Sequence, residues 1–301
     1  QAPTLIADRL GRIVIARSRI ARWICEIMPE FIREAARFVE MCEKPFDLQD
    51  MRKNSRGEHW FSICGHDRNN KYPALSEFHQ NNVAAIEWFF RPGSPASRIS
   101  DFGSAFVKTH FPGVARRFRE GISVIEREYG VKPLFGLFFN FCLNAARPGE
   151  VERVHCLPHA DYKNLALAVC LVFVYGRLGL LERCWLVMWE AGLIIQIPPG
   201  VFIAYPSALF YHFNIDLAGS TVGPDLPTPA NSTKLANGAP GRGSCVWFNQ
   251  ASMWQTAELG EHTIKQAKAK GMNTTCDNGE FLDDLIFGKV PGPEGRPQPT
   301  L

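Results

Sequence analysis

The chain lacks any apolar run long enough to cross a membrane. Although 46% of its 301 residues are apolar, the longest unbroken apolar stretch is Leu165 to Tyr175, about half of the ~20 residues that a membrane-spanning helix needs. It also lacks the strong charge imbalance of a disordered chain, because the formal net charge is only +3 and 12% of the residues are aromatic. We therefore expect a globular protein that has a sizeable core and no membrane-spanning segment.

Several catalytic and redox signatures are missing as well. The sequence has no glycine-flanked serine of the hydrolase type, no glycine-rich phosphate loop and no Cys-x-x-Cys pair. Its nine cysteines are an odd number and lie mostly among apolar neighbours. This pattern indicates reduced, buried thiols in an intracellular protein rather than a disulfide framework.

The two halves of the chain differ in charge and in predicted secondary structure. Residues 1–150 carry 22 basic and 17 acidic side chains, whereas residues 151–301 carry 11 and 13. Helical spacing of apolar residues in the first half predicts helices over 16–42, 75–90 and 114–129. Arginines cluster over 9–22 and 116–119, where they are either phosphate contacts or parts of a solvated face.

The second half favours strands. Short runs rich in Val, Ile, Phe and Trp, separated by Gly and Pro, predict strands over 134–143, 165–175, 184–189, 193–197, 201–205, 208–215 and 244–251. A helix is predicted over 258–270. This indicates an α+β protein: a basic helical portion (1–132) packed on a barrel or sandwich core (133–290), with a loop insertion at 219–243 and a flexible tail at 291–301.

Three polar residues lie within or beside this apolar region. Because successive strand residues alternate faces, His159 and Asp161 project to the same side, and His212 follows about 50 residues later. Two imidazoles and one carboxylate can hold an iron ion and leave coordination positions open. The residues alone also allow a surface pair with a core histidine. A zinc site using His155 and His159 is a further alternative, although Pro158 disfavours a helix there.

An arginine begins the last predicted strand. Arg242 would enter a sheet of apolar residues, where its planar guanidinium needs a buried anion or an exit to solvent. A dicarboxylate co-substrate that chelates a metal at one end would supply that anion at the other. The alternative is an ordinary loop arginine at the end of a strand.

Three motifs now carry a resemblance: HADYKN at 159–164, LFYHFNIDL at 209–217 and RGSCVWFNQASM at 242–253. Together they resemble 2-oxoglutarate/Fe(II) dioxygenases of the TET/J-binding-protein group, including its fungal members. The resemblance implies a double-stranded β-helix, a jelly-roll-like core with the N-terminal helices packed on it. It further implies a catalytic iron held by His159, Asp161 and His212.

The resemblance also assigns the remaining site residues. It implies that Arg242 and Ser244 bind the co-substrate 2-oxoglutarate, and that Asn164, Phe248 and Gln250 contact a flipped base. Gln250 departs from the pattern, because many relatives carry a histidine there. Since glutamine both donates and accepts hydrogen bonds, the preferred base edge is left open.

The resemblance implies an enzyme that oxidises the methyl group of a methylated DNA base. From 5-methylcytosine the product would be 5-hydroxymethylcytosine or a more oxidised form. From N6-methyladenine the product would be demethylated adenine, and the enzyme could act on one or both bases. In either case the base would be flipped out of duplex DNA. We expect an intracellular, nuclear, monomeric protein. Three alternatives stay open: a hydroxylase of a protein or small molecule, a non-catalytic DNA-binding module, and the zinc hydrolase.

Overall fold

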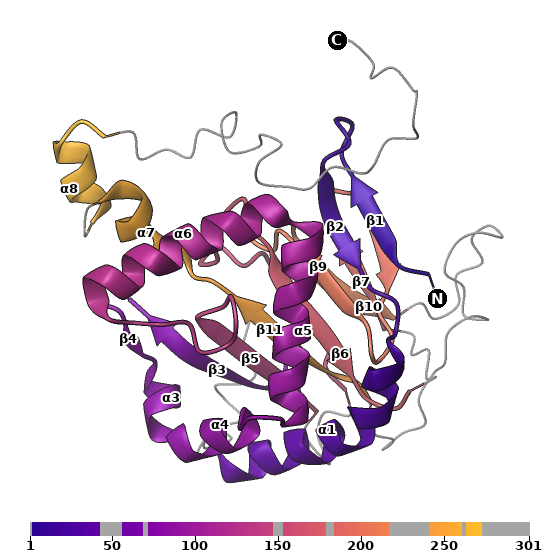
Figure 1. Ribbon diagram of the computed structural model, residues 1–301. Helices are drawn as coiled ribbons and strands as arrows, with labels where there is room; N and C mark the ends of the chain where they lie inside the picture. The colour runs from indigo at the N-terminus through magenta and orange to yellow at the C-terminus, as the bar shows by residue number, and fades with distance from the viewer. Residues whose placement is uncertain are drawn as a thin grey trace.

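The computed structural model describes residues 2–42, 56–68, 72–146, 153–178, 184–216, 241–260 and 263–272. They form two antiparallel sheets, and helices α1, α5 and α6 lie across one face of the larger sheet (Figure 1). No helix within these ranges is long and apolar enough to span a membrane.

The larger sheet has eight strands. In spatial order they are β1 (Thr4–Ala7), β2 (Ile13–Arg17), β9 (Phe202–Tyr205), β6 (Cys170–Tyr175), β11 (Gly243–Phe248), β5 (Asn140–Ala145), β3 (Trp60–Asp67) and β4 (Ala74–Leu75). The smaller sheet has the order β10 (His212–Asp216), β7 (Cys184–Met188) and β8 (Leu193–Gln196).

The segment around His159 extends the smaller sheet beside β10. The amide of His159 donates to the carbonyl of His212 at 3.2 Å, and the amide of His212 donates back at 2.9 Å. From β5 onward the chain thus passes from sheet to sheet: β5, the His159 segment, β6, β7 with β8, β9, β10 and β11. This is the double-stranded β-helix that the resemblance predicted, and the fold class is confirmed.

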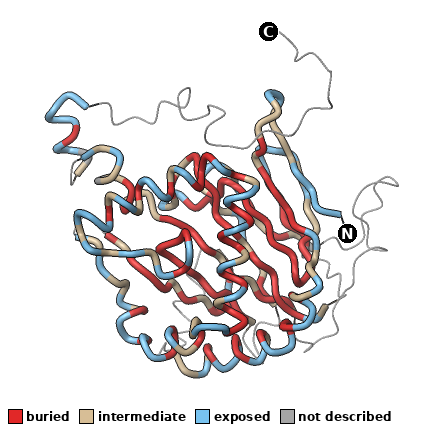
Figure 2. Tube along the Cα trace, viewed as in Figure 1, coloured by how far each residue is buried: buried red, intermediate tan, exposed pale blue. Residues whose placement is uncertain are grey.

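Seven helices complete the described part of the chain. They are α1 (Arg22–Met41), α3 (Glu77–Asn81), α4 (Val83–Phe89), α5 (Pro95–His110), α6 (Pro112–Tyr129), α7 (Ala251–Leu259) and α8 (Ile264–Ala269). An aromatic core lies between helices and sheet: the rings of Phe38 and Phe89 stack at 4.7 Å, and Phe31 meets Phe173 of β6 edge-on at 5.9 Å. Buried segments follow this layer and the sheets (Figure 2). Burial of so many rings fixes the sheet against the helices.

The N-terminal portion contains strands that the sequence reasoning missed. Strands β1 to β4 all come from residues 1–132, and β2 joins β9 while β3 joins β5, so this portion shares its sheet with the barrel. The helix predicted from residue 16 starts at Arg22, since Ala16 and Arg17 belong to β2. The helix predicted over 75–90 is broken at Asn82, whose backbone leaves the helical region and whose side chain donates to Phe78 O.

Other predicted boundaries shift for local reasons. The aromatic run 134–143 begins with a tight turn at Gly136 (φ 68°), so β5 starts only at Asn140. The strands predicted over 165–175 and 208–215 begin later, at Cys170 and His212. The strand predicted over 244–251 ends at Phe248, where α7 follows after two residues.

Part of the predicted organisation lies outside the described residues. The helix predicted over 258–270 is replaced by the end of α7 and the short α8. Most of the predicted loop insertion and the whole predicted tail are not described. The limits of the predicted portions therefore stay predictions.

The contact between α6 and α7 gives a stability prediction. A Cβ added at Gly121 would lie 2.1 Å from Nε1 of the buried Trp254 indole. Replacing glycine by alanine in a helix normally stabilises it by about 1 kcal/mol. We expect Gly121→Ala instead to lower the free energy of unfolding by about 1–3 kcal/mol, the usual cost of overpacking. Urea unfolding would measure this, with the exposed Ser123→Ala on the same helix as control; an unchanged or higher stability for Gly121→Ala contradicts the packing.

Candidate metal centre and its cavity

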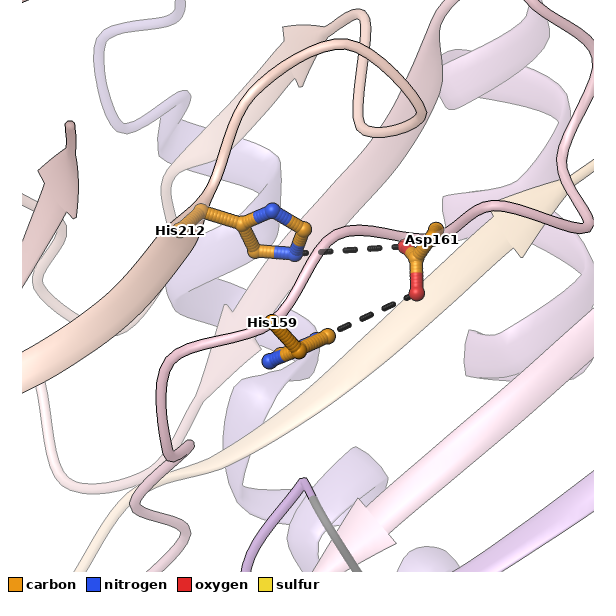
Figure 3. A group of neighbouring side chains, drawn as sticks. All are labelled: His159, Asp161 and His212. Carbon is orange, nitrogen blue, oxygen red and sulfur yellow. Dashed lines mark ion pairs between the residues drawn. The ribbon is translucent and has the colours of Figure 1, made fainter. Parts of the chain in front are cut away.

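His159, Asp161 and His212 converge from two neighbouring segments of the smaller sheet. Their candidate ligand atoms all lie within 4.8 Å of one another. Nε2 of His159 is 3.9 Å from one carboxylate oxygen of Asp161, and Nε2 of His212 is 3.9 Å from the other (Figure 3). These separations are too long for direct hydrogen bonds and suit three ligands around one ion.

Backbone carbonyls fix the orientation of both imidazoles. Nδ1 of His159 lies 2.6 Å from Leu157 O, and Nδ1 of His212 lies 2.9 Å from Phe210 O. Each ring therefore donates its Nδ1–H to the carbonyl two residues before it, which leaves the Nε2 lone pair directed at the shared point. This is the usual outer-shell arrangement for metal-binding histidines.

Asp161 is held in place by three groups. Its amide donates to Ser207 O at 2.9 Å, the Asn164 side-chain amide lies 3.3 Å from one carboxylate oxygen, and the Arg56 guanidinium lies 2.8 Å from the other. Sequence reasoning did not find Arg56, because no spacing links it to the motif. Asn164 also donates to the Ser207 hydroxyl at 3.0 Å, so in this structure it positions Asp161.

Burial keeps both histidines neutral near pH 7. Desolvation is the largest cause that lowers the pKa of His159, and it lowers the pKa of His212 to about 4. A neutral imidazole has the free lone pair that a metal ion requires. The donor set of two imidazoles and one carboxylate fits the facial triad of non-haem Fe(II) oxygenases. Among the described residues, His155 does not belong to this group of three candidate ligands.

The centre opens into a cavity of about 370 Å³ between the two sheets. All eight predicted site residues line it: His159, Asp161, Asn164, His212, Arg242, Ser244, Phe248 and Gln250. Apolar side chains, among them Val172, Val174 and Leu186, form much of its wall. The structure thus brings the predicted residues into one space, while their individual roles stay proposals.

Arg242 and Ser244 lie together at one end of this cavity. Arg242 is 5% exposed, and one of its N–H groups donates to Ile197 O at 3.1 Å. The Ser244 hydroxyl accepts a hydrogen bond from Asn144 Nδ2 at 3.1 Å. A buried guanidinium that borders the same cavity as three metal-ligating side chains suits a dicarboxylate spanning the two.

Phe248, Gln250 and Asn164 lie towards the opposite end of β11. Phe248 is 8% exposed, and Gln250 pairs with Asn164 through an isolated β-bridge. The backbone hydrogen bonds from Leu165 N to Asn249 O and from Ala251 N to Lys163 O hold these two segments side by side.

His59 is a further cavity residue that sequence reasoning missed. It is 2% exposed, burial lowers its pKa to about 4, and its Nδ1 has no hydrogen-bond partner. It precedes β3, a strand whose existence was not predicted, so no signal in the sequence could have placed it at the site.

The arginine clusters have mainly structural partners. Arg117 forms a bidentate pair with Glu258 (2.6 and 3.0 Å) and donates to the carbonyl of Ala166 at 2.7 Å. Arg17 donates to Gln196 O at 2.9 Å, and Arg12 pairs with Asp8. Arg117 and Arg17 thus join separate elements of the fold, whereas Arg12 closes the turn between β1 and β2.

Comparisons with known proteins find no matching family model and no matching curated protein. Among solved structures, the chain is similar to NgTET1 in complex with 5mC DNA, with 13% identity, a TM-score of 0.48, and coverage of 82% of this chain and 76% of that one. It is also similar to OsALKBH1 (11% identity, TM-score 0.41, coverage 82% and 100%). A 2OG-Fe(II) oxygenase family protein from Burkholderia pseudomallei gives 14% identity, a TM-score of 0.38, and coverage of 80% and 84%.

These likenesses are too distant to assign a substrate, so only the chain's own topology and cavity bear on its chemistry. A double-stranded β-helix carries two histidines and an aspartate on its smaller sheet, with a buried arginine in the same cavity. This combination of fold and site suits the chemistry of the 2-oxoglutarate- and Fe(II)-dependent dioxygenases, the class that the sequence resemblance implied. Fe(II) and 2-oxoglutarate both fit the residues present.

The buried histidines give a pH prediction for metal binding. An ordinary histidine begins to compete with metal for its proton below a pH of about 6.5. Because burial lowers the pKa of His159, and that of His212 to about 4, we expect Mn(II) affinity to begin to fall at a lower pH than an ordinary histidine pair would give, and His212 to compete for protons only towards pH 4. Calorimetric titration in non-chelating buffers would measure this. A decline centred near pH 6.5 contradicts the burial of the ligands.

Proposed function

We propose that this protein is an Fe(II)- and 2-oxoglutarate-dependent dioxygenase that oxidises the methyl group of a methylated DNA base. The observation that carries the proposal is the single cavity: the triad lies beside it, Arg242 borders one end, and Phe248 with Gln250 borders the other. One space therefore offers a metal centre, a partner for a dicarboxylate and a wall suited to a flat, polar-edged substrate.

His159, Asp161 and His212 would hold Fe(II), and bound iron with 2-oxoglutarate would supply the chemistry: O₂ oxidises 2-oxoglutarate to succinate and CO₂ and inserts one oxygen atom into a substrate C–H bond. Arg242 orients the co-substrate by pairing with its far carboxylate, and the Ser244 hydroxyl lies on the same strand, two residues away. The apolar walls exclude water, which strengthens the charge pairing within the cavity.

A methylated base suits the other end of the cavity. A base inside a duplex must be flipped out before its methyl group can reach an enclosed centre, and it is then held by stacking and by hydrogen bonds to its edge. Phe248, the last residue of β11, offers a ring, and Gln250, two residues beyond it, offers an amide; both side chains line the cavity. Lys163, exposed at this end, is a candidate contact for the adjoining phosphate.

The same centre could serve a protein or small-molecule hydroxylase. We favour the base because the substrate end combines an aromatic ring with side-chain amides, a set that reads a base edge. Within this proposal the substrate is 5-methylcytosine or N6-methyladenine in duplex DNA, the protein acts as a monomer, and its place is the nucleus. The retained metal ligands disfavour a purely DNA-binding module.

The proposal predicts methyl oxidation coupled to succinate formation. We expect the protein with Fe(II), 2-oxoglutarate and O₂ to convert oligonucleotides carrying 5-methylcytosine or N6-methyladenine, and Asp161→Ala to abolish conversion because one metal ligand is lost. Mass spectrometry of nucleosides and of succinate would measure this, with the exposed Asp101→Ala as control. If no methylated oligonucleotide is altered or raises succinate formation, while a peptide or small molecule does, the base assignment is wrong.

The role of Arg242 gives a separate prediction. Removing one member of a buried charge pair costs about 2–5 kcal/mol, so Arg242→Ala should raise KM for 2-oxoglutarate by at least about 30-fold while Fe(II) binding persists. The exposed Arg177→Ala should leave that KM unchanged. Initial rates against 2-oxoglutarate concentration would measure both variants. Equal KM values for Arg242→Ala and the unaltered protein would remove Arg242 from the co-substrate site.

A further inference from the structure

Asp67 is an acidic side chain of the cavity that neither the fold nor the proposed metal centre uses. It is the last residue of β3, it is half-buried, and it lines the cavity. Asp161, the other acidic residue of the lining, is engaged by Arg56 and Asn164. By contrast, no hydrogen bond or ion pair joins the Asp67 carboxylate to the rest of the protein as the structure describes it.

The register of the larger sheet places Gly65, two residues before Asp67, level with Phe248, two residues before Gln250. Strands β3 and β11 both pair with β5, and Asn140 of β5 lies opposite Gly65 on one side and Phe248 on the other. Asp67 lies two residues beyond Gly65, and Gln250 two residues beyond Phe248. The two side chains therefore border the same end of the cavity on either side of β5.

The separation suits a flat ring. Neighbouring strands lie about 4.8 Å apart, so two strands that flank a third are about 10 Å apart. This leaves room for one heteroaromatic ring with a hydrogen bond of about 2.9 Å on each side. Like Asp67, the Gln250 side chain has no hydrogen bond within the described residues, so both groups are available to a ligand.

Charge divides the cavity into two ends. The Arg242 guanidinium lies at the start of β11, and Asp67 lies level with the far end of that strand. A carboxylate accepts hydrogen bonds and repels anions, so the surroundings of Asp67 disfavour the carboxylates of the co-substrate and favour a neutral group that carries N–H, while Lys163 lies at the exposed mouth of this end. The acidic co-substrate and the substrate are thereby directed to opposite ends.

We infer that Asp67 selects the substrate base: its carboxylate accepts a hydrogen bond from the exocyclic amino group of a methylated cytosine or adenine, and the Gln250 amide donates to an acceptor on the other side of the ring, such as O2 of cytosine or N3 of adenine. This inference rests on the proposed function and deepens it. Cytosine and adenine carry an amino donor where thymine carries a carbonyl acceptor. The single N–H on the pairing edge of thymine lies between two carbonyl oxygens, and these repel an approaching carboxylate. Thymine is thus excluded as a substrate.

The test uses three duplex oligonucleotides that differ only at one position, which holds 5-methylcytosine, N6-methyladenine or thymine. We expect kcat/KM of the unaltered protein for at least one of the two methylated amino bases to exceed that for thymine at least tenfold. Asp67→Asn should lower kcat/KM for that base by about 10–100-fold, the value of one hydrogen bond to a charged group. It should also reduce the preference over thymine, because asparagine can donate to the thymine carbonyl.

Matched measurements separate recognition from folding. Substrate-independent succinate formation and KM for 2-oxoglutarate should be the same in Asp67→Asn, in a second variant Asp67→Ser, and in the exposed control Asp101→Asn. Loss of that basal turnover in both Asp67 variants would make Asp67 a structural residue and overturn the inference.

The remaining outcomes distinguish the two proposals. If the unaltered protein converts methylated DNA but uses thymine equally well, or if Asp67→Asn keeps both rate and preference, the Asp67 inference alone is overturned. If the unaltered protein converts none of the three oligonucleotides, the proposed function fails and the inference fails with it.

Discussion

The site depends on one backbone pairing, the bridge between His159 and His212. Two segments more than fifty residues apart in sequence exchange amide–carbonyl hydrogen bonds at 3.2 and 2.9 Å, which brings both imidazoles to one side of the smaller sheet. Each ring then donates Nδ1–H to a carbonyl two residues earlier. Because backbone groups set the positions and the ring orientations, the two Nε2 atoms are preorganised around Asp161, and a metal would not have to order them.

The larger sheet supplies what surrounds this centre. The aromatic layer beneath α1 and α4 packs against its outer face and stabilises the fold there. Its inner face can therefore border an open cavity without loss of the fold. On that inner face β11 runs from Gly243 to Phe248, with Arg242 just before it and Gln250 two residues after it, and all of these residues except Trp247 and Cys245 belong to the lining of the cavity or flank it. The length of one strand thereby separates a cationic end from an end with available hydrogen-bonding groups. In the proposed function the anionic 2-oxoglutarate binds at the first end and the neutral base at the second.

The fold class and the eight cavity residues followed from the resemblance that three local motifs carry, whereas strand alternation alone placed only His159 and Asp161 on one side. The sequence did not reveal strands β1 to β4, since their pairing with β9 and β5 joins segments far apart in the sequence. Arg56, His59 and Asp67 lie on or next to β3, so they were missed together. Asn164 shows a subtler limit: its position matched the motif, but its contacts with Asp161 and Ser207 appear only in three dimensions.

The central claim is that the triad holds Fe(II) while Arg242 grips 2-oxoglutarate in the same cavity. Anaerobic addition of Fe(II) and then 2-oxoglutarate tests it most directly, because chelation of iron by a keto acid produces a visible charge-transfer absorption. We predict that the band develops with one equivalent of each, is absent in His212→Ala, and requires far more 2-oxoglutarate in Arg242→Ala. A protein that shows no band, or a band of equal strength in His212→Ala, would contradict the account.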